Sequence, residues 1–284
     1  MAASNRVLLG LLGHPISHSA APAMMEAAGA AVGLDIRYHL IDVAGAEPDV
    51  IRRILDGVRL IGFAGINVTF PYKQAVIPFL DALDPGAAQV GAVNLVTVRD
   101  GRLTGHNTDA TGFLSGLRAT VGDAAKAGPA VLIGAGGAGR AIAWSLARGG
   151  VPEVRVVDQD PARAAALAEE ASGWGGGRFL PAPGVAEAVQ GAAGLVNASP
   201  AGMLPDTSSP VDSALLRAGM WVADAVYHPP VTPLLAAATA LGCAIMPGRA
   251  MSVGQAGDGF ALFTGRTAPP GVIGDAFDRH VSAR

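Results

Sequence analysis

Short apolar runs alternate along the chain with longer segments in which apolar residues recur at helical spacing. The pattern predicts strands over 6–12, 36–42, 61–68, 92–98, 131–134, 153–158, 178–180, 193–197, 220–226 and 243–246. It predicts helices over 20–32, 47–57, 72–80, 108–126, 232–241, 249–264 and 271–282. Such alternation is typical of parallel βαβ units, so an α/β fold is expected.

The strand predicted over 131–134 leads into a glycine-rich turn and then into a helical segment. Gly134, Gly136 and Gly139 form a Gly-x-Gly-x-x-Gly motif. In a dinucleotide-binding turn these glycines permit the tight turn, the approach of a pyrophosphate and close packing of helix on strand. The helix N-terminus would offer N–H groups to the phosphates. Because the chain holds 39 Gly, the motif alone is a weak signal, and a structural turn is the alternative.

A carboxylate after the next predicted strand strengthens the dinucleotide interpretation. Asp158 follows Gly134 by 24 residues, close to the separation of roughly 20 that such sites use. A carboxylate there would accept hydrogen bonds from the ribose hydroxyls and repel a 2′-phosphate. The sequence therefore predicts NAD as the cofactor, with NADP disfavoured.

The glycine-rich turn stands near the middle of the chain, so about 130 residues fold before it. We predict an N-terminal α/β substrate domain over 1–110, completed by 249–284, and a Rossmann-type, doubly wound NAD-binding domain over 111–248. The two last predicted helices follow the second sheet, and we expect them to return to the first domain. A ligand cleft would then lie between the domains.

Composition narrows the function classes. Hydrophobic residues make up 50% of the chain and charged residues 15%, with a mean hydropathy of +0.39, as expected of a core-rich α/β protein. A net charge of −3 gives no electrostatic basis for binding nucleic acid or an anionic membrane. The apolar run Val7–Leu12 is too short to span a bilayer and precedes no convincing cleavage pattern, so a cytoplasmic protein is expected. The one cysteine, Cys243, excludes an intrachain disulfide and a multi-cysteine metal site, and we predict no metal.

Four polar clusters border predicted strands of the first domain: Gly13–Pro22, Asn67–Lys73, Gly91–Asn94 and Gly105–Asp109. Ligands of open α/β sheets bind beyond the carboxyl ends of the strands, so we expect the clusters to converge on one site. In isolation, Lys73 also fits a solvated lysine in a first helical turn, and Asp109 fits a helix N-terminal cap.

The clusters, together with the tail segment Gly248–Ala256, resemble the shikimate dehydrogenase family over nearly the whole chain. The resemblance depends on Asn67-Val68-Thr69 with Lys73, and on Asn94, Asn107-Thr108-Asp109 and Gln255. It implies reversible hydride transfer between a nicotinamide and the C3 hydroxyl of shikimate or quinate, giving 3-dehydroshikimate or 3-dehydroquinate. Such a reaction belongs to the shikimate pathway of aromatic amino acid biosynthesis or to quinate catabolism.

By the same resemblance, Lys73 and Asp109 form the catalytic pair. Oxidising an alcohol requires a base that takes the hydroxyl proton as hydride leaves. A free lysine has a pKa near about 10.4, so a basic role near neutrality requires a cleft that disfavours its charge. We expect Asp109 to orient the ammonium and to hold the substrate hydroxyl, and either residue could exchange the proton.

The resemblance also assigns binding residues. Thr69 and Ser19 would lie near the substrate, with Ser19 at its carboxylate. Asn94 and Gln255 would bind the ring hydroxyls, and Tyr227 would stand at the cleft. The cofactor would contact Gly134, Gly136, Gly137, Ala138, Gly139, Asp158, Asn197, Met203 and Gly248. Thr69 and Tyr227 also fit purely structural roles, and Met203 fits a buried loop residue.

The chain departs from the family pattern at three places, of which Ala21 and the segment from Asp158 bear on specificity. Ala21 stands where members usually carry a second Ser or Thr, and the loss of such a bond to a charged group costs roughly 1.5–3 kcal/mol. Met25 replaces a frequent His, which we interpret as a packing change. Asp158-Gln159-Asp160 replaces the Asn-Arg-Thr of NADP-using members, so the chain resembles the NAD-preferring quinate/shikimate dehydrogenase branch. We expect the nearby Arg163 to pair with acids or to face solvent.

Two alternatives remain open at this point. Ala21 leaves room for a paralogue that acts on a related cyclohexane polyol carboxylate, such as an aminoshikimate. A non-catalytic, nucleotide-sensing homologue is the other, although a sensor needs no Lys73 and Asp109 pair. The expected partner is a small-molecule substrate, and the chain is expected to act as a monomer or a homodimer.

Overall fold

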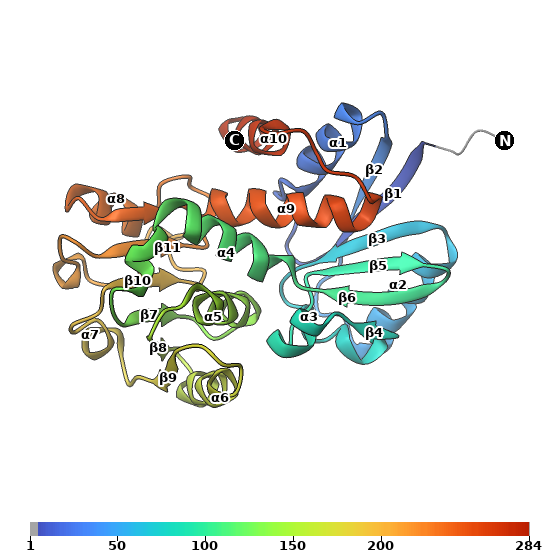
Figure 1. Cartoon of the computed structure of the whole chain (residues 1–284). Coiled ribbons are helices and arrows are strands. Elements are labelled where there is room, and N and C mark those ends of the chain that lie inside the picture. Colours follow the sequence, from blue (N-terminus) through green and yellow to red (C-terminus); the bar gives the residue numbers. More distant parts are fainter. Residues whose placement is uncertain (1–4, 284) are drawn as a thin grey trace. The chain divides into compact units, whose positions relative to one another are not determined.

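The structure is a computed structural model that describes residues 5–283. The chain forms two compact units. The first contains the residues up to Thr108 and those from Gln255 onward, and the second contains Asp109–Gly254 (Figure 1). Within residues 5–283, no helix is both long and apolar enough to cross a membrane.

The first unit is built on a mixed six-stranded sheet with the order β2-β1-β3-β5-β6-β4. Its strands are β1 (Arg6–Gly13), β2 (Asp35–Asp42), β3 (Phe63–Val68), β4 (Ala82–Leu83), β5 (Leu95–Arg99) and β6 (Arg102–His106). β1 pairs in parallel with β2 and β3, whereas β5 is antiparallel to both of its neighbours. The expectation of parallel units alone is therefore wrong for this sheet.

The hairpin between β5 and β6 explains the difference. Asp100 and Gly101 connect the two strands with φ angles of 50° and 72°. A two-residue connection with both residues at positive φ joins antiparallel neighbours, and Asp-Gly is a favoured sequence for it. The sequence therefore contains a hairpin signal, Asp100-Gly101, that the alternation of strands and helices does not reveal.

The helices of the first unit are α1 (Ala21–Ala31), α2 (Pro48–Leu60), α3 (Pro85–Val90), α10 (Val272–Ser282) and the later part of α9 (Gly248–Thr264). The helix α1 packs against β2, α2 packs against β3, and α10 packs against α1. Apolar residues of α2 pack with those of β3 in one buried cluster. On α9, a Cβ added to Gly259 would lie 3.0 Å from the Leu95 side chain, and Arg99 donates to Phe263 O at 2.8 Å. The C-terminal helices therefore return to the first unit, as predicted.

The helix predicted over 72–80 is wrong. The segment after β3 is a series of turns that ends in one 3₁₀ turn, η1 (Ile77–Phe79). Pro78 has no N–H to donate, its ring would clash with the carbonyl four residues earlier, and it disfavours the α conformation of Ile77. An α-helix therefore cannot continue through this segment.

The second unit contains an all-parallel sheet with the order β12-β11-β10-β7-β8-β9. The strands are β7 (Ala130–Ile133), β8 (Glu153–Val157), β9 (Arg178–Pro181), β10 (Gly194–Asn197), β11 (Trp221–Asp224) and β12 (Ala244–Met246). The strand order reverses direction between β7 and β10, which is the Rossmann arrangement. Ligands of such sheets bind at this switch point.

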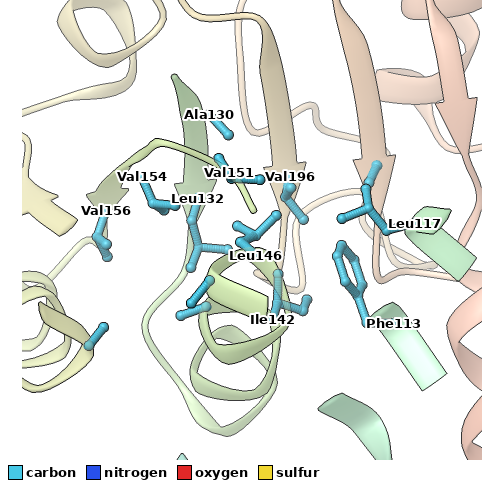
Figure 2. Close-up of a cluster of buried hydrophobic side chains, with 14 of the residues drawn as sticks. Phe113, Leu117, Ala130, Leu132, Ile142, Leu146, Val151, Val154, Val156 and Val196 are labelled. Atoms are coloured by element: carbon cyan, nitrogen blue, oxygen red, sulfur yellow. The ribbon is translucent and has the colours of Figure 1, made fainter. Parts of the chain in front are cut away.

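Alternate residues of the second sheet pack against helices on opposite faces. Leu132 and Val196 face α4 (Thr108–Thr120), α5 (Gly137–Gly149) and α6 (Pro161–Ser172) in one buried cluster (Figure 2). Val131 and Leu195 face α7 (Val185–Ala188) and α8 (Pro233–Ala240) in another. Both faces of the sheet are covered, so its strands are almost continuously apolar. Two short 3₁₀ turns, η2 (Gly122–Lys126) and η3 (Ser213–Leu215), complete the unit.

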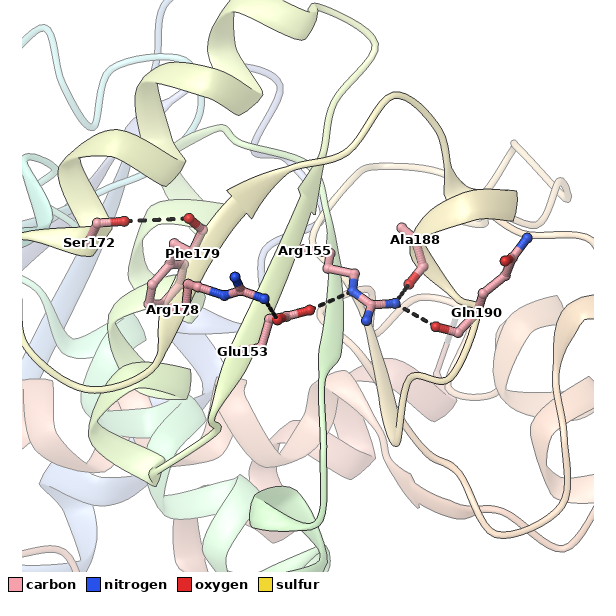
Figure 3. A network of polar contacts seen from close by, with 7 residues as sticks. All are labelled: Glu153, Arg155, Ser172, Arg178, Phe179, Ala188 and Gln190. Atoms are coloured by element: carbon pink, nitrogen blue, oxygen red, sulfur yellow. Dashed lines mark hydrogen bonds and ion pairs between the residues drawn. The ribbon is translucent and has the colours of Figure 1, made fainter.

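A charged network ties the first residues of β8 and β9 together (Figure 3). Glu153 accepts hydrogen bonds from Arg155 Nε at 2.8 Å and from Arg178. Arg155 also donates to Ala188 O at 2.9 Å, at the end of α7. The hydrogen bonds from Arg178 and Arg155 hold the pKa of Glu153 below its ordinary value.

Replacing Glu153 by Gln should lower the free energy of unfolding by about 1–2 kcal/mol at neutral pH, because charge-assisted bonds are lost. Since the folded pKa lies below the unfolded value of about 4.3, this stabilisation is present above that value and is lost as the pH falls through the folded pKa. Urea unfolding at neutral pH and at about pH 3 measures the difference in free energy of unfolding between the wild type and the variant. The exposed Glu169→Gln is the control. An equal difference at both pH values would contradict this account of Glu153.

Candidate active site

One edge of the first sheet gathers the four polar clusters. The parallel strands β1, β3 and β6 end at this edge, and β5 begins there because it is antiparallel. Val68 N donates to Asn94 O at 2.8 Å, and Asn94 N donates to His106 O at 3.0 Å. The backbone ladder therefore holds the ends of three strands side by side, and with them the polar segments that border these strands.

Asn94 and Thr108 form the centre of this edge. Asn94 is 3% exposed and Thr108 also 3%. Asn94 Oδ1 accepts the Thr108 backbone N–H at 2.7 Å, and Asn94 Nδ2 donates to Thr108 Oγ1 at 3.0 Å. Thr108 Oγ1 then donates to Gln255 Oε1 at 3.4 Å. The orientation of the Gln255 amide is thus tied to Asn94, which brings two of the predicted substrate residues into one hydrogen-bonded group.

Asn67 extends this group toward β2. Its Nδ2 donates to Asn94 O at 3.4 Å, and its Oδ1 accepts the Tyr38 hydroxyl at 2.7 Å. Burial raises the pKa of Tyr38, so the phenol stays protonated and keeps donating. Tyr38 is not among the predicted site residues, because its position within β2 looks like that of an ordinary strand aromatic.

Thr69 and Lys73 lie in the turns that follow β3. Thr69 N donates to Leu12 O at 2.9 Å, and Val93 N donates to Lys73 O at 2.7 Å. Both side chains are half-buried. Because no helix begins here, Lys73 is not a first-turn helical lysine, and its backbone is fixed beside the segment that carries Asn94.

Asp109 directly follows Thr108 in the first turn of α4 and is 6% exposed. Carboxylates are rarely buried to this extent unless they are paired. Its neighbour Asn107 is anchored through its side-chain amide to Ala92 O at 2.8 Å. The start of α4 is thus held by side-chain bonds on Asn107 and Thr108.

The segment after β1 carries Ser19 and leads into α1. Ser19 is half-buried, and its Oγ accepts the Ala21 backbone N–H at 3.2 Å. Ala21 is the first residue of α1 and is 9% exposed, so the departure from the family pattern lies at a largely buried position. His14 Nδ1 lies 2.7 Å from Asp42 Oδ1, which connects this segment to the end of β2.

The glycine-rich turn of the second unit has a backbone that side chains would block. Gly134 has a φ of 101°, and a Cβ there would lie 2.9 Å from the Ala198 carbonyl carbon. A Cβ on Gly139 would lie 1.9 Å from Gly134 O. Gly136 precedes α5, and no side chain caps the helix there. The turn after β7 and the turn after β10 therefore touch at the switch point, where the uncapped helix start can receive an anion.

Asp158 lies against this turn. Its Oδ2 accepts the Ala135 backbone N–H at 2.7 Å, and its Oδ1 accepts the Asp160 backbone N–H at 3.0 Å. Each carboxylate oxygen can accept a second hydrogen bond, so both keep capacity for hydroxyl donors. Arg163 is exposed, and its Nη2 lies 3.2 Å from the position of a Cβ on Gly136. The residues present fit a dinucleotide at this turn.

Asn197 ends β10 and is completely buried. Its Nδ2 donates to Ala201 O at 3.1 Å and to Asp224 Oδ1 at 3.0 Å, while its Oδ1 accepts from Ser199 N and Ser199 Oγ at 3.0 and 2.7 Å. These contacts use all the hydrogen-bonding capacity of the amide. The Asn197 side chain can therefore serve a cofactor only through the loop that it holds.

The remaining predicted residues are Met203 and Tyr227, in the loops after β10 and β11, and Gly248, at the start of α9. Met203 is 48% exposed, which excludes the alternative of a buried loop residue. Tyr227 is half-buried in the loop after β11. Gly248 begins α9, and a Cβ there would lie 2.5 Å from Val226 O, so only glycine fits.

The chain is similar to known proteins over most of its length. A family model described as the shikimate dehydrogenase substrate binding domain matches residues 11–96. The quinate/shikimate dehydrogenase (NAD(+)) of Corynebacterium efficiens is 47% identical over 91% of this chain and 93% of that protein. The shikimate dehydrogenase (NADP(+)) of Pseudarthrobacter chlorophenolicus is 42% identical over 93% of this chain and 91% of that protein.

A solved structure of a similarly named protein also matches the chain. Quinate dehydrogenase from Corynebacterium glutamicum in complex with NAD has a TM-score of 0.89 and 39% identity. The match covers 96% of this chain and 99% of that chain. Relatives named for NAD and for NADP therefore lie at similar levels of identity to this chain.

Proposed function

The chain belongs to the shikimate dehydrogenase family, and from this premise we propose that it is an NAD-preferring quinate/shikimate dehydrogenase. It transfers a hydride reversibly between NAD and the C3 hydroxyl of shikimate or quinate. The observation that carries the proposal is the convergence of Asn94, Thr108 and Gln255 at one sheet edge, beside the segment that holds Lys73. Such a concentration of oriented amides and hydroxyls suits a polyol substrate.

The proposed roles follow from chemistry and position. Lys73 and Asp109 form the pair that takes the proton from the substrate hydroxyl, with Asp109 orienting the Lys73 ammonium. Asn94 and Gln255 bind ring hydroxyls. The bonds through Thr108 orient their amides before the substrate arrives. Ser19 stands at the substrate carboxylate, with Thr69 and Tyr227 beside the substrate.

The cofactor proposal depends on Asp158. Gly134, Gly136, Gly137, Ala138 and Gly139 would hold the pyrophosphate against the start of α5. Asp158 would accept the ribose hydroxyls, and its negative charge disfavours a 2′-phosphate. When bound, the nicotinamide supplies the acceptor for the hydride. Met203 and Gly248 stand at the nicotinamide end in this proposal, and Asn197 supports the loop of Met203.

A substrate panel tests the proposed function. Formation of reduced nicotinamide is measured with NAD and with shikimate, quinate and an aminated analogue as separate hydride donors. Turnover of shikimate or quinate supports the proposal. Preference for the aminated analogue would favour the paralogue suggested by Ala21. Binding of NAD without turnover of any donor would favour a nucleotide sensor.

Ala21 supplies a prediction about substrate affinity. The wild type should have a high Michaelis constant for shikimate, and Ala21→Ser should lower it about tenfold by restoring a hydroxyl donor at the substrate carboxylate. Steady-state kinetics measures the change, with Ala23→Ser in the same helical turn as the control. Micromolar affinity of the wild type for shikimate would show that another group already supplies the missing bond.

A further inference from the structure

A buried carboxylate stands where β11 ends. Asp224 is 1% exposed. Its Oδ1 accepts hydrogen bonds from Asn197 Nδ2 at 3.0 Å and from Val226 N at 2.9 Å, and its Oδ2 accepts from Thr232 Oγ1 at 2.7 Å. The three donors are thus the last residue of β10 and two residues of the segment after β11.

These bonds connect the loop after β10 with the segment after β11. Through Asn197, the carboxylate fixes Ser199 and Ala201 in the loop after β10. Through Val226 and Thr232 it fixes both ends of the segment after β11. One further contact, from Leu204 N to His228 O at 3.1 Å, joins the middles of the two loops.

The loops carry side chains that a dehydrogenase would need. Met203 is 48% exposed on the first loop, although its segment is closely bonded, and Tyr227 lies on the second. The positions of both side chains therefore depend on the bonds that Asn197 and Asp224 make to these loops.

Burying a carboxylate costs free energy, and an apolar side chain could fill the same space without that cost. Removal from water raises the pKa of Asp224 to about 6, against the lowering effect of its three donors. Apolar residues of similar volume often stabilise a fold as well as a buried charge does. A charge kept at this position is explained better by the geometry that it imposes on the two loops than by stability.

We propose that Asp224 is a positioning residue for hydride transfer, which sets the loops of Met203 and Tyr227 relative to one another through Asn197 and Thr232. This inference rests on the proposed function. It separates two tasks of the second unit, because Asp224 bonds to Asn197, Val226 and Thr232. Asp158 bonds instead to the backbone of the glycine-rich turn at Ala135, at the proposed adenosine and pyrophosphate end. Loss of Asp224 should therefore slow turnover far more than it weakens nucleotide binding.

The first test uses the cofactor-free full-length protein. Amide hydrogen exchange is compared between the wild type and Asp224→Asn, which keeps the shape but cannot accept from Thr232 at the substituted nitrogen. We expect exchange to rise about tenfold or more over 198–206 and 226–232 and to stay unchanged over 134–140. Unchanged exchange in both loops, or an equal rise throughout the second unit, would overturn the proposal.

The second test separates turnover from binding. For Asp224→Asn we expect kcat to fall about tenfold or more, while the dissociation constant of NADH changes less than about threefold. Thr232→Val should act in the same direction, and Thr232→Ser, which keeps the hydroxyl, should restore kcat. The matched control is Asp212→Asn. Asp212 is exposed and caps η3 by accepting a hydrogen bond from Ala214 N.

The outcomes distinguish the inference from the function on which it rests. A wild type that turns over neither shikimate nor quinate would refute the proposed function, whatever the exchange data show. An active wild type whose Asp224→Asn and Thr232→Val variants keep full kcat would refute the positioning role alone. Equal loss of kcat and NADH affinity, without rescue by Thr232→Ser, would also refute it, because a general loss of structure would then explain the result.

Discussion

Lys73→Ala should lower kcat by about 10³-fold or more, in the range found when a positioned acid or base is removed. The alanine variant keeps Asp109 but loses the amine, so the proposed pair that carries the hydroxyl proton is incomplete. The Michaelis constant for the substrate should change little, because Asn94, Gln255 and Ser19 supply the binding contacts in this account. Steady-state kinetics in both reaction directions measures the two parameters.

The control for Lys73 is its neighbour Gln74, which is exposed. Gln74→Ala alters the same series of turns without removing the amine, so its kcat should equal that of the wild type. Circular dichroism and thermal unfolding of both variants check that the fold is kept. Normal turnover by Lys73→Ala would remove Lys73 from the catalytic pair.

Asp158→Ser should lower the ratio of kcat/KM with NAD to kcat/KM with NADP by about 30- to 100-fold. The variant loses charge-assisted bonds to the ribose, which are worth roughly 1.5–3 kcal/mol, and no longer repels a 2′-phosphate. It also loses the acceptor of the Ala135 N–H. That loss weakens the turn for both cofactors, so the ratio is the quantity to compare.

Asp160→Ser provides the matched control for Asp158. Asp160 is exposed and caps α6 by accepting from Ala162 N at 2.9 Å. Serine is also a good N-cap, so α6 should keep its start. The same charge is removed two residues away, and the cofactor ratio should change less than about threefold if the preference depends on direct contact. An equal effect of both substitutions would mean that net charge, and not contact with the ribose, sets the preference.

Much of the second unit could be predicted because its sequence signals are local. The apolar run before Gly134 and the glycine spacing predict strand, turn and helix in order, and the sheet has the expected Rossmann order. The helix α6 was missed, although Asp160 and Pro161 form a favourable start for a helix.

The first unit was harder to predict because its site depends on strand direction. The cluster containing Asn94 precedes β5, and it reaches the common edge because β5 is antiparallel. That direction depends on the two-residue turn at Asp100 and Gly101. Convergence of the clusters was expected from parallel strands, whereas the mixed sheet achieves it by a hairpin.

The hydrogen bonds that hold the site residues in place are the feature least evident from the sequence. Tyr38 and Asp224 stand in ordinary strands with no motif around them, and their partners Asn67 and Asn197 are remote along the chain. Contacts between residues almost 30 positions apart have no periodic signature. Such residues become visible only when the folded chain shows which polar atoms are buried together.

The central claim, an NAD-preferring dehydrogenase of shikimate or quinate, is tested most directly by one measurement on the wild type. The specificity constant kcat/KM is determined for NAD and for NADP, with saturating shikimate or quinate as the hydride donor. We predict that reduced nicotinamide forms from at least one of the two donors, with NAD favoured by about tenfold or more. Absence of turnover with both donors and both cofactors, or equal or greater efficiency with NADP, would contradict the account.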